Sequence, residues 1–432
     1  MLKRCDEALL FDEALLFDEA LLFVRRALEV ERAAMRGGIG ETIGEALVMA
    51  SNVAGSTPCF NAMRLASHEY SCGMMEAMKP LDAPLGIGVL SFAHGHANAY
   101  CEQIATFSDA RVVAAWDWDA ARAQSSCERF GLEFVPDLEE LLSRADIHAV
   151  IVTSETNRHA ELIEAACAHG KAILCQKPMA TTLADCDRII RAVEQSGVHF
   201  QMAFQMRSDP LNQKTKEWID AGEVGRVGAL RRRHCINFLF NSDIATGPNA
   251  WHLSPEKNVG MFFDDAVHAA DFFLWLLGMP SSVIAEINNT LTTVAPDDTG
   301  IAIYKWSAEK NNALGAIFNS SVTLAGENTC EIYGDQGVII QNYDDGVSVS
   351  HAPAGVSALK LFRKKTNAWE TFDHALPAAH YERLKAVPRP WIDNLLSGSP
   401  SAVSAQEGKQ SVAMCLGAYQ SAREGRRIQL QD

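Results

Sequence analysis

"LGIGVLSFAHGHANAYCEQIATF", residues 85–107, predicts a buried strand, a tight turn and an amphipathic helix, in that order. Its start is a continuous apolar run, which is typical of a strand covered on both faces. From residue 96 onward the apolar side chains follow helical spacing. A strand, a turn and a helix together are the repeating unit of a doubly wound α/β sheet.

The same alternation continues along the chain up to residue 204. Further buried strands are predicted at 110–117, 149–154, 171–178 and 198–204, and amphipathic helices at 119–130, 157–170 and 182–197. About six parallel strands fit between residues 85 and 204. We therefore predict an α/β Rossmann-type dinucleotide-binding domain over residues 84–205.

The pattern becomes less regular after Arg207. A helix and a strand are followed by an apolar helix at 264–277, several long strands and two closing helices. Strands gathered in this way predict an α+β domain with a mostly antiparallel sheet. We assign residues 206–432 to this domain and expect it to bind the substrate and to form the oligomer.

Residues 1–77 precede the first predicted strand and contain DEALLF three times in succession, from Asp6 to Phe23. Because a helix has 3.6 residues per turn, a period of six spreads these apolar patches around all faces. We expect an extension that is poorly structured or dispensable, or an upstream stretch read through from a misplaced start, with Met78 as the natural beginning. The alternative is an oligomerisation or docking segment.

Charge and cysteine content limit the classes of function. The net charge of −16 and the pI near 5.3 disfavour binding to nucleic acid or to an anionic membrane. No apolar run is long enough to suggest a membrane span. The eleven cysteines contain no C-x-x-C pair, which predicts reduced thiols in a cytoplasmic protein and no metal site.

The turn after the first strand, Ser91 to Ala97, lies where a Rossmann fold binds the pyrophosphate. Ser91, Ala93 and His96 occupy the places of the three glycines, and Phe92 and His94 lie between them. Small residues at the first two places still permit close backbone approach. We predict a cofactor-binding turn in which both histidines donate to phosphate. The alternative is that they are solvated loop residues.

Asp117 ends the second predicted strand. A carboxylate there accepts hydrogen bonds from both adenosine ribose hydroxyls and repels a 2′-phosphate. We therefore predict NAD as the cofactor, with NADP still possible. The alternative is an ordinary aspartate in a turn.

Two further segments carry candidate catalytic groups. Lys177 follows the strand at 171–175, so it points into the crevice where such sheets bind ligands, and a cis bond before Pro178 would aim it. Asp264, His268 and Asp271 lie at i, i+4 and i+7 and share one face of an otherwise apolar helix. Ionisable groups on a buried helix are costly unless they are paired or face a site. We predict a function for Asp264 and His268, and a structural role for Asp271. The alternatives are a surface lysine, a helix cap and a core histidine.

The chain resembles the Gfo/Idh/MocA oxidoreductases, which include glucose–fructose oxidoreductase and inositol dehydrogenase. The resemblance runs from Leu85 to the C-terminus through the segments TSETNRH (153–159), GKAILCQKPMA (170–180), FQMRSDP (204–210), GEVGRV (222–227), GMFFDDAVHAADFFLWLLG (260–278) and GAYQSAREGRRIQL (417–430). It implies that Lys177 is the catalytic lysine and that Asp264 and His268 handle substrate. It also implies cofactor contacts from Thr153, Ser154, His159 and Gln176, the last replacing a usual Glu.

The resemblance and the chemistry of these side chains together predict an NAD(P)-dependent dehydrogenase acting on a sugar or cyclitol hydroxyl. His268 or Lys177 would take the hydroxyl proton, and Lys177 would stabilise negative charge on the oxygen. Arg207 and Trp251 are expected to line the substrate pocket. The alternatives are an NAD-using glycosidase and a non-catalytic ligand-sensing regulator. A homodimer or homotetramer is expected because sheets in this family often pair face to face.

Overall fold

The computed structural model describes residues 79–241, 243–341, 357–372 and 380–430. All of them fall within one compact unit, Glu76–Asp432. The expected extension over residues 1–77, its hexapeptide repeat and the start at Met78 lie outside the described residues, so what we expect of them stays a prediction.

The first sheet has six strands in the order β3-β2-β1-β4-β5-β6, and every pair is parallel. The chain reverses its winding direction between β1 and β4, and such sheets bind ligands at this point. The predicted Rossmann-type architecture is confirmed. The strands are β1 Leu85–Leu90, β2 Ala110–Trp116, β3 Glu133–Phe134, β4 Ala149–Val152, β5 Ala172–Cys175 and β6 Phe200–Met202.

Helices connect these strands, and their ends follow ordinary capping rules. Asp119 and Thr182 accept hydrogen bonds from backbone N–H groups three residues later, which starts α5 and α8. Gly131 and Gly197 end the same helices in the left-handed conformation that favours glycine. The helices are α4 His96–Ile104, α5 Ala120–Phe130, α6 Leu138–Ser143, α7 His159–Ala168 and α8 Leu183–Ser196.

The second sheet has nine strands in the order β14-β13-β12-β11-β7-β10-β9-β8-β15. All its pairs are antiparallel except β7 with β10, so the predicted α+β architecture is confirmed. The strands are β7 Val227–Asn237, β8 Ser282–Asn288, β9 Thr299–Lys305, β10 Leu314–Ser320, β11 Val322–Gly334, β12 Gly337–Gln341, β13 Leu359–Arg363, β14 Ala368–Phe372 and β15 Ile428–Gln429.

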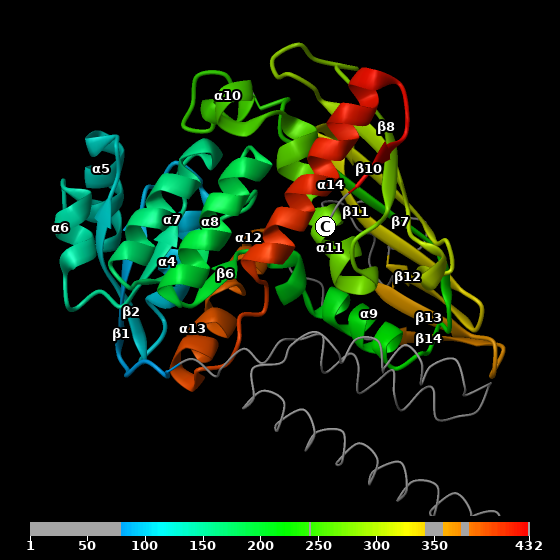
Figure 1. Cartoon of the computed structure of the whole chain (residues 1–432), viewed down its shortest axis with the longest axis horizontal. Helices are drawn as coiled ribbons and strands as arrows, with labels where there is room; N and C mark the ends of the chain where they lie inside the picture. The colour runs from blue at the N-terminus through cyan, green and yellow to red at the C-terminus, as the bar shows by residue number, and fades with distance from the viewer. Residues whose placement is uncertain (1–78, 242, 342–356, 373–379, 431–432) are drawn as a thin grey trace, which may run out of the picture. The chain divides into compact units, whose positions relative to one another are not determined.

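Helices α11 and α14 pack on one face of the second sheet, and α14 also contacts α8 and β6 of the first domain (Figure 1). None of the described helices combines the length and the apolar character needed to cross a bilayer. The helical elements of this part are η1 Thr156–Arg158, η2 Gln205–Ser208, α9 Pro210–Asp220, η3 Ala250–Leu253, α10 Pro255–Asn258, α11 Met261–Leu277, η4 Ala308–Lys310, α12 His380–Lys385, α13 Pro388–Ser397 and α14 Ala405–Glu424.

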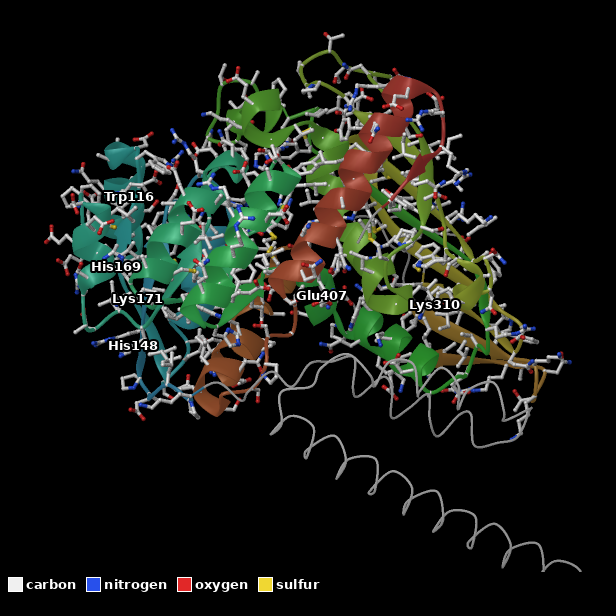
Figure 2. The ribbon with its side chains drawn as sticks, in the orientation of Figure 1. Trp116, His148, His169, Lys171, Lys310 and Glu407 are labelled. Atoms are coloured by element: carbon white, nitrogen blue, oxygen red, sulfur yellow. The ribbon has the colours of Figure 1, made fainter. Side chains whose placement is uncertain are left out.

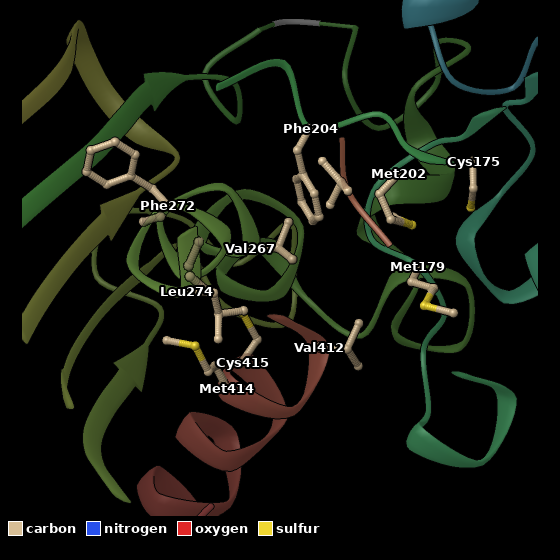
Figure 3. Packing of buried hydrophobic residues seen from close by; sticks show 14 of the residues in the cluster. Cys175, Met179, Met202, Phe204, Val267, Phe272, Leu274, Val412, Met414 and Cys415 are labelled. Carbon is tan, nitrogen blue, oxygen red and sulfur yellow. The ribbon is translucent and has the colours of Figure 1, made fainter. Parts of the chain in front are cut away.

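One apolar cluster joins the two sheets (Figure 3). Side chains of α11 and α14 pack in it together with residues from β5, β6 and the segments after them. Because the cluster is continuous, the strand end that carries Lys177 has a fixed position relative to α11. Its labelled members are Cys175, Met179, Met202, Phe204, Val267, Phe272, Leu274, Val412, Met414 and Cys415.

The contact between β10 and α11 gives a test of this packing. A Cβ added at Gly315 would lie 2.8 Å from atoms of Phe273 and Trp306. We expect Gly315→Ala to lower the free energy of unfolding by about 1–3 kcal/mol, as overpacked cores do. Urea unfolding followed by circular dichroism measures this change. In the control, Gly228→Ala on β7, the added Cβ would lie 3.9 Å from the Tyr333 carbonyl oxygen, and the change should stay within about 0.5 kcal/mol. Equal losses in both variants would contradict the packing argument.

Candidate active site

The carboxyl ends of β1, β4 and β5 meet at one edge of the first sheet, where their loops are hydrogen-bonded to one another. The Thr153 hydroxyl donates to the Ser91 carbonyl at 2.7 Å, and the His94 N–H donates to the Thr153 carbonyl at 2.9 Å. The Gln176 N–H donates to the Val152 carbonyl at 2.9 Å. These bonds make the edge a preorganised surface for a ligand.

Lys177, Asp264 and His252 form the centre of the site. Lys177 Nζ donates to Asp264 Oδ1 at 2.8 Å and to the Asp264 backbone carbonyl at 3.1 Å. His252 Nδ1 lies 2.6 Å from Asp264 Oδ2. All three side chains are buried. The peptide bond between Lys177 and Pro178 is cis, as the sequence suggested.

Two neighbouring carboxyl groups at the start of α11, those of Asp264 and Asp265, have pKa values shifted in opposite directions. Burial alone would raise the pKa of Asp264, but Lys177 and His252 outweigh it and hold this pKa well below the ordinary value. Burial and the charge of Asp264 raise the pKa of Asp265 to about 7. The Ser321 hydroxyl donates to Asp265 at 2.6 Å. The site therefore contains an ionised carboxylate that holds a lysine and an imidazole.

His252 was not predicted from the sequence. It lies on η3, twelve residues before Asp264, and no spacing rule brings these two residues together. Its neighbour Trp251, expected in the substrate pocket, donates from Nε1 to the Ala93 carbonyl at 3.0 Å. The rings of Trp251 and His252 stack with centroids 3.7 Å apart. The one available signal was the position of His252 directly after a predicted pocket residue.

His268 lies one helical turn after Asp264 on α11 and shares its face. Its ring centroid is 5.3 Å from that of His234 on β7 and 6.3 Å from that of Phe204. The predicted proton-accepting role of His268 is compatible with this position and stays a prediction.

The predicted phosphate turn fits a dinucleotide. Ser91 adopts a left-handed φ of 74°, at the place where the family pattern has glycine. Helix α4 begins at His96, and its N-cap residue Gly95 makes no side-chain capping bond. A Cβ added at Gly95 would meet no atom within 4 Å. An uncapped helix N-terminus with open space beside it is suited to a pyrophosphate.

His94 points from this turn toward the catalytic centre. Its ring centroid lies 5.3 Å from that of His252 and 5.9 Å from that of Trp251. Burial, followed by the nearby charges of His96 and Lys177, holds the pKa of His94 well below its ordinary value. A neutral imidazole is the result, and the predicted donation by His94 and His96 to phosphate stays a prediction.

Asp117 is buried at the end of β2 and already accepts several hydrogen bonds. The Phe92 N–H donates to it at 2.8 Å and the Ser91 hydroxyl at 3.0 Å. Arg122, which was not singled out in the sequence, donates to it from Nε at 2.7 Å and from Nη2 at 2.6 Å. An arginine of α5 therefore shares this carboxylate, and the role of Asp117 as ribose acceptor stays a prediction.

The other predicted cofactor residues shape the edge of the sheet. His159 Nδ1 lies 3.0 Å from the Pro178 carbonyl, and its Nε2 lies 3.2 Å from the Ser154 carbonyl. Gln176 accepts from the Lys177 N–H at 2.8 Å through its side-chain oxygen. These contacts hold the loops after β4 and β5 in position, and direct contact with a cofactor stays a prediction for them and for Thr153.

Arg207 lies in an ion-pair network on the far part of α11. Its Nε and Nη2 donate to Asp271, the latter at 2.6 Å, and its Nη1 donates to Glu407 at 2.8 Å. Glu407 lies in the first turn of α14 (Figure 2). The network ties η2 to α11 and α14, as a structural role of Asp271 requires. The predicted substrate contact of Arg207 receives no support from these bonds and stays a prediction.

Several curated dehydrogenases are similar to this chain. The myo-inositol 2-dehydrogenase of Thermotoga maritima is 26% identical over 359 residues, which cover 81% of this chain and 98% of that protein. Inositol 2-dehydrogenase 3 of Saccharopolyspora erythraea is 28% identical over 311 residues, covering 71% and 83% of the two chains.

The fold and the family are established by two further comparisons. A solved structure of levoglucosan dehydrogenase in complex with NADH and levoglucosan matches with a TM-score of 0.69 at 20% identity, covering 81% of this chain and all of that chain, and shows the shared fold. Residues 85–204 match the oxidoreductase family with the NAD-binding Rossmann fold, and residues 212–340 match the Gfo/Idh/MocA C-terminal domain. These two matches cover more than half of the 432 residues, and the chain belongs to the Gfo/Idh/MocA family of oxidoreductases.

Proposed function

We propose that this protein is an NAD-dependent dehydrogenase that oxidises a secondary hydroxyl of a sugar or cyclitol. The observation that carries the proposal is the buried cluster of Lys177, Asp264 and His252 at the ligand-binding edge of a Rossmann sheet. The names of the relatives, which are inositol dehydrogenases, support the class of substrate.

Bound NAD supplies the acceptor for the hydride that leaves the alcohol carbon. The residues of this chain perform the remaining tasks. The turn from Ser91 and the start of α4 hold the pyrophosphate. The Lys177 ammonium donates to the alcohol oxygen and stabilises negative charge as the O–H bond weakens. A neutral imidazole accepts the proton.

Asp264 holds the Lys177 side chain in one orientation before substrate binds. Its carboxylate pairs with Lys177 at 2.8 Å, and a buried ammonium needs such a partner. Since the second carboxylate oxygen holds His252, neither oxygen is left without a donor. The lysine is therefore oriented before an alcohol enters.

Two other functions were considered, an NAD-using glycosidase and a ligand-sensing regulator. The relatives and the solved structure named above are dehydrogenases, which favours net oxidation. A panel of sugars, inositols and sugar acids with NAD, followed by absorbance of the reduced nicotinamide, separates the three. A dehydrogenase accumulates NADH, a glycosidase releases an aglycone without net NADH, and a regulator does neither.

We also propose a cytoplasmic location. The eight cysteines within the described residues are all free and buried, which suits a reducing compartment. Fractionation of the expressing cells tests this location.

Lys177→Ala tests the catalytic lysine. We expect kcat to fall about 100- to 1000-fold because the alcohol oxygen loses its charged donor, while the Kd for NAD changes less than about twofold. Lys171→Ala is the matched control. Lys171 lies just before β5, at the opposite end of that strand, and donates to the Arg144 and Ile147 carbonyls (Figure 2). Unchanged turnover in the Lys177 variant would remove this residue from the mechanism.

Substitution of Asp117, the partner of Arg122, tests the choice between NAD and NADP. We expect wild type to bind NADH more tightly than NADPH in a fluorescence titration, because the Asp117 carboxylate repels a 2′-phosphate. Asp117→Ala should weaken NADH binding about tenfold and strengthen NADPH binding, since Arg122 loses its partner at 2.6 Å and becomes available to a phosphate. Tighter NADPH binding by wild type would reverse the assignment.

We further propose that the outer face of the second sheet pairs with the same face of a second copy. Ile303 on β9 lies beside Ile284 on β8 and Ala316 on β10, in cross-strand register. Exposed fractions are 38% for Ile284, 49% for Ile301 and 42% for Ile303, although these are large apolar side chains. Exposed large apolar side chains gathered on one sheet face, here beside Glu286 in register with Ile301, are typical of an interface, and a self-complementary one gives a twofold dimer.

Ile284→Asp tests this interface. A carboxylate in the apolar patch should shift the protein toward monomer in light scattering after gel filtration, at low micromolar concentration. Leu183→Asp is the matched control, because Leu183 is also 38% exposed but lies at the start of α8 in the other domain. An unchanged mass for the Ile284 variant, or equal dissociation of both variants, would contradict the proposal.

A further inference from the structure

We propose that Asp297 and Tyr419 are positioning residues of the reaction. Together they replace the missing cap of helix α11 and so fix the place of Asp264 relative to Lys177. This inference rests on the proposed dehydrogenase function. It names two residues that act on the site through the backbone of α11.

Helix α11 begins without a side chain of its own to satisfy its first N–H groups. The first turn of any helix has N–H groups with no partner inside the helix. An ordinary N-cap serine or aspartate accepts from the N–H two or three residues later. The N-cap residue here is Gly260, which makes no side-chain capping bond. The acceptors for α11 must therefore come from elsewhere in the chain.

Asp297 and Tyr419 supply these acceptors from two other parts of the second domain. The Phe262 N–H donates to Asp297 Oδ1 at 2.7 Å, and the Phe263 N–H donates to the Tyr419 hydroxyl at 3.2 Å. That hydroxyl donates in turn to Asp297 Oδ2 at 2.7 Å. It therefore uses its one proton and one lone pair at the same time. We call these two side chains the α11 clamp.

The α11 clamp occupies the space where a cap side chain would lie. A Cβ added at Gly260 would overlap Asp297 Oδ2 and lie 2.5 Å from the Tyr419 hydroxyl oxygen. Asp297 is buried. Burial raises the pKa of Asp297, and the hydrogen bonds from Tyr419 and Phe262 oppose that rise. The clamp is therefore a replacement for the missing cap, and each of its members depends on the other.

Both members of the clamp are fixed to surrounding elements. The residue after Asp297 is Asp298, whose N–H donates to β8 at 3.1 Å and whose carbonyl accepts from the Ser321 N–H at 2.9 Å. Tyr419 lies on α14, which packs against α11 and β8. Its ring meets that of Phe262 edge-on, with centroids 6.0 Å apart. The clamp thus ties the start of α11 to the second sheet and to α14.

Asp264 follows directly after the two clamped N–H groups. Its own N–H donates to the Gly260 carbonyl at 3.1 Å and closes the first turn. Lys177 donates both to its carboxylate and to its backbone carbonyl, so the lysine depends on the main chain of α11 as well as on a side chain. A shift of the first turn therefore moves both groups that orient Lys177. A displacement of about 1 Å can cost about 100-fold in rate.

The backbone just before α11 is held in an unfavourable conformation. Val259 has a φ of 63° and a ψ of −64°, which a β-branched residue rarely adopts. Such strain persists only where the surrounding structure fixes it. The α11 clamp holds the chain three residues later, at Phe262. We therefore expect loss of the clamp to let this backbone relax and to displace the first turn of α11.

The test compares Tyr419→Phe with Tyr304→Phe as the matched control. Tyr304 is also buried and donates to the Met414 carbonyl on α14 at 3.2 Å, but its ring lies near Phe273, in the second half of α11. With NAD and the panel alcohol that wild type oxidises best, we expect Tyr419→Phe to lower kcat about tenfold and Tyr304→Phe less than twofold. The Kd for NAD should stay within about twofold in both. Amide hydrogen exchange in residues 260–268 should accelerate in Tyr419→Phe alone.

Substitutions of Asp297 separate positioning from general stability. Asp297→Ala removes both acceptors, and kcat should fall about 30- to 100-fold. Asp297→Asn keeps one oxygen that can accept from the Phe262 N–H, so it should lose clearly less than Asp297→Ala. All rates are measured where circular dichroism shows the same folded signal as in wild type. A role in stability alone would change the melting temperature and leave kcat of the folded protein unchanged.

The outcomes for the clamp and for the enzyme differ. If wild type oxidises an alcohol and the folded Tyr419 and Asp297 variants keep its kcat, the inference is overturned and the dehydrogenase function stands. Equal losses in Tyr419→Phe and Tyr304→Phe overturn it as well. If wild type oxidises no alcohol of the panel, both proposals are overturned. Should Asp297→Ala fail to fold, Tyr419→Phe and Asp297→Asn decide by the same criteria.

Discussion

The proposed function depends on the ion pair between Lys177 and Asp264, because this contact joins the two domains at the site. One partner follows a strand of the first sheet, and the other lies in the first turn of a helix that covers the second sheet. Removing both charges from water costs several kcal/mol per ion, and only good geometry with additional hydrogen bonds offsets that cost. Here the two carboxylate oxygens of Asp264 are held by Lys177 and His252. The apolar cluster of α11, α14 and β6 supplies the rigidity that such geometry needs.

Much of this arrangement follows from the sequence. Alternating apolar strands and amphipathic helices predicted the parallel sheet, because strands buried on both faces have a distinctive composition. The position of Lys177 after such a strand, and of Asp264 on an apolar helix, predicted that both belong to a site. One strand was missed for a physical reason. Strand β3 has two residues, which is too short for any periodicity.

The residues that were missed share one property. His252 and Arg122 are defined by their partners in space, and no spacing in the sequence predicts either pairing. His252 reaches Asp264 because η3 folds back beside α11, and Arg122 reaches Asp117 because α5 begins directly after β2. Arg207 shows the reverse case. Its charge and position suggested a substrate contact, but Asp271 and Glu407 use the hydrogen-bonding capacity of its guanidinium.

The indole of Trp251 joins two parts of the molecule that have different tasks. It donates to the carbonyl of Ala93 in the dinucleotide turn and stacks on the ring that Asp264 holds. A shift of that turn on loading with cofactor would therefore be transmitted through a single side chain to the alcohol pocket. Thermodynamic linkage then requires reciprocity: whatever factor the nucleotide imposes on alcohol affinity, the alcohol imposes on nucleotide affinity. A side chain of this kind would couple the affinities for the two ligands.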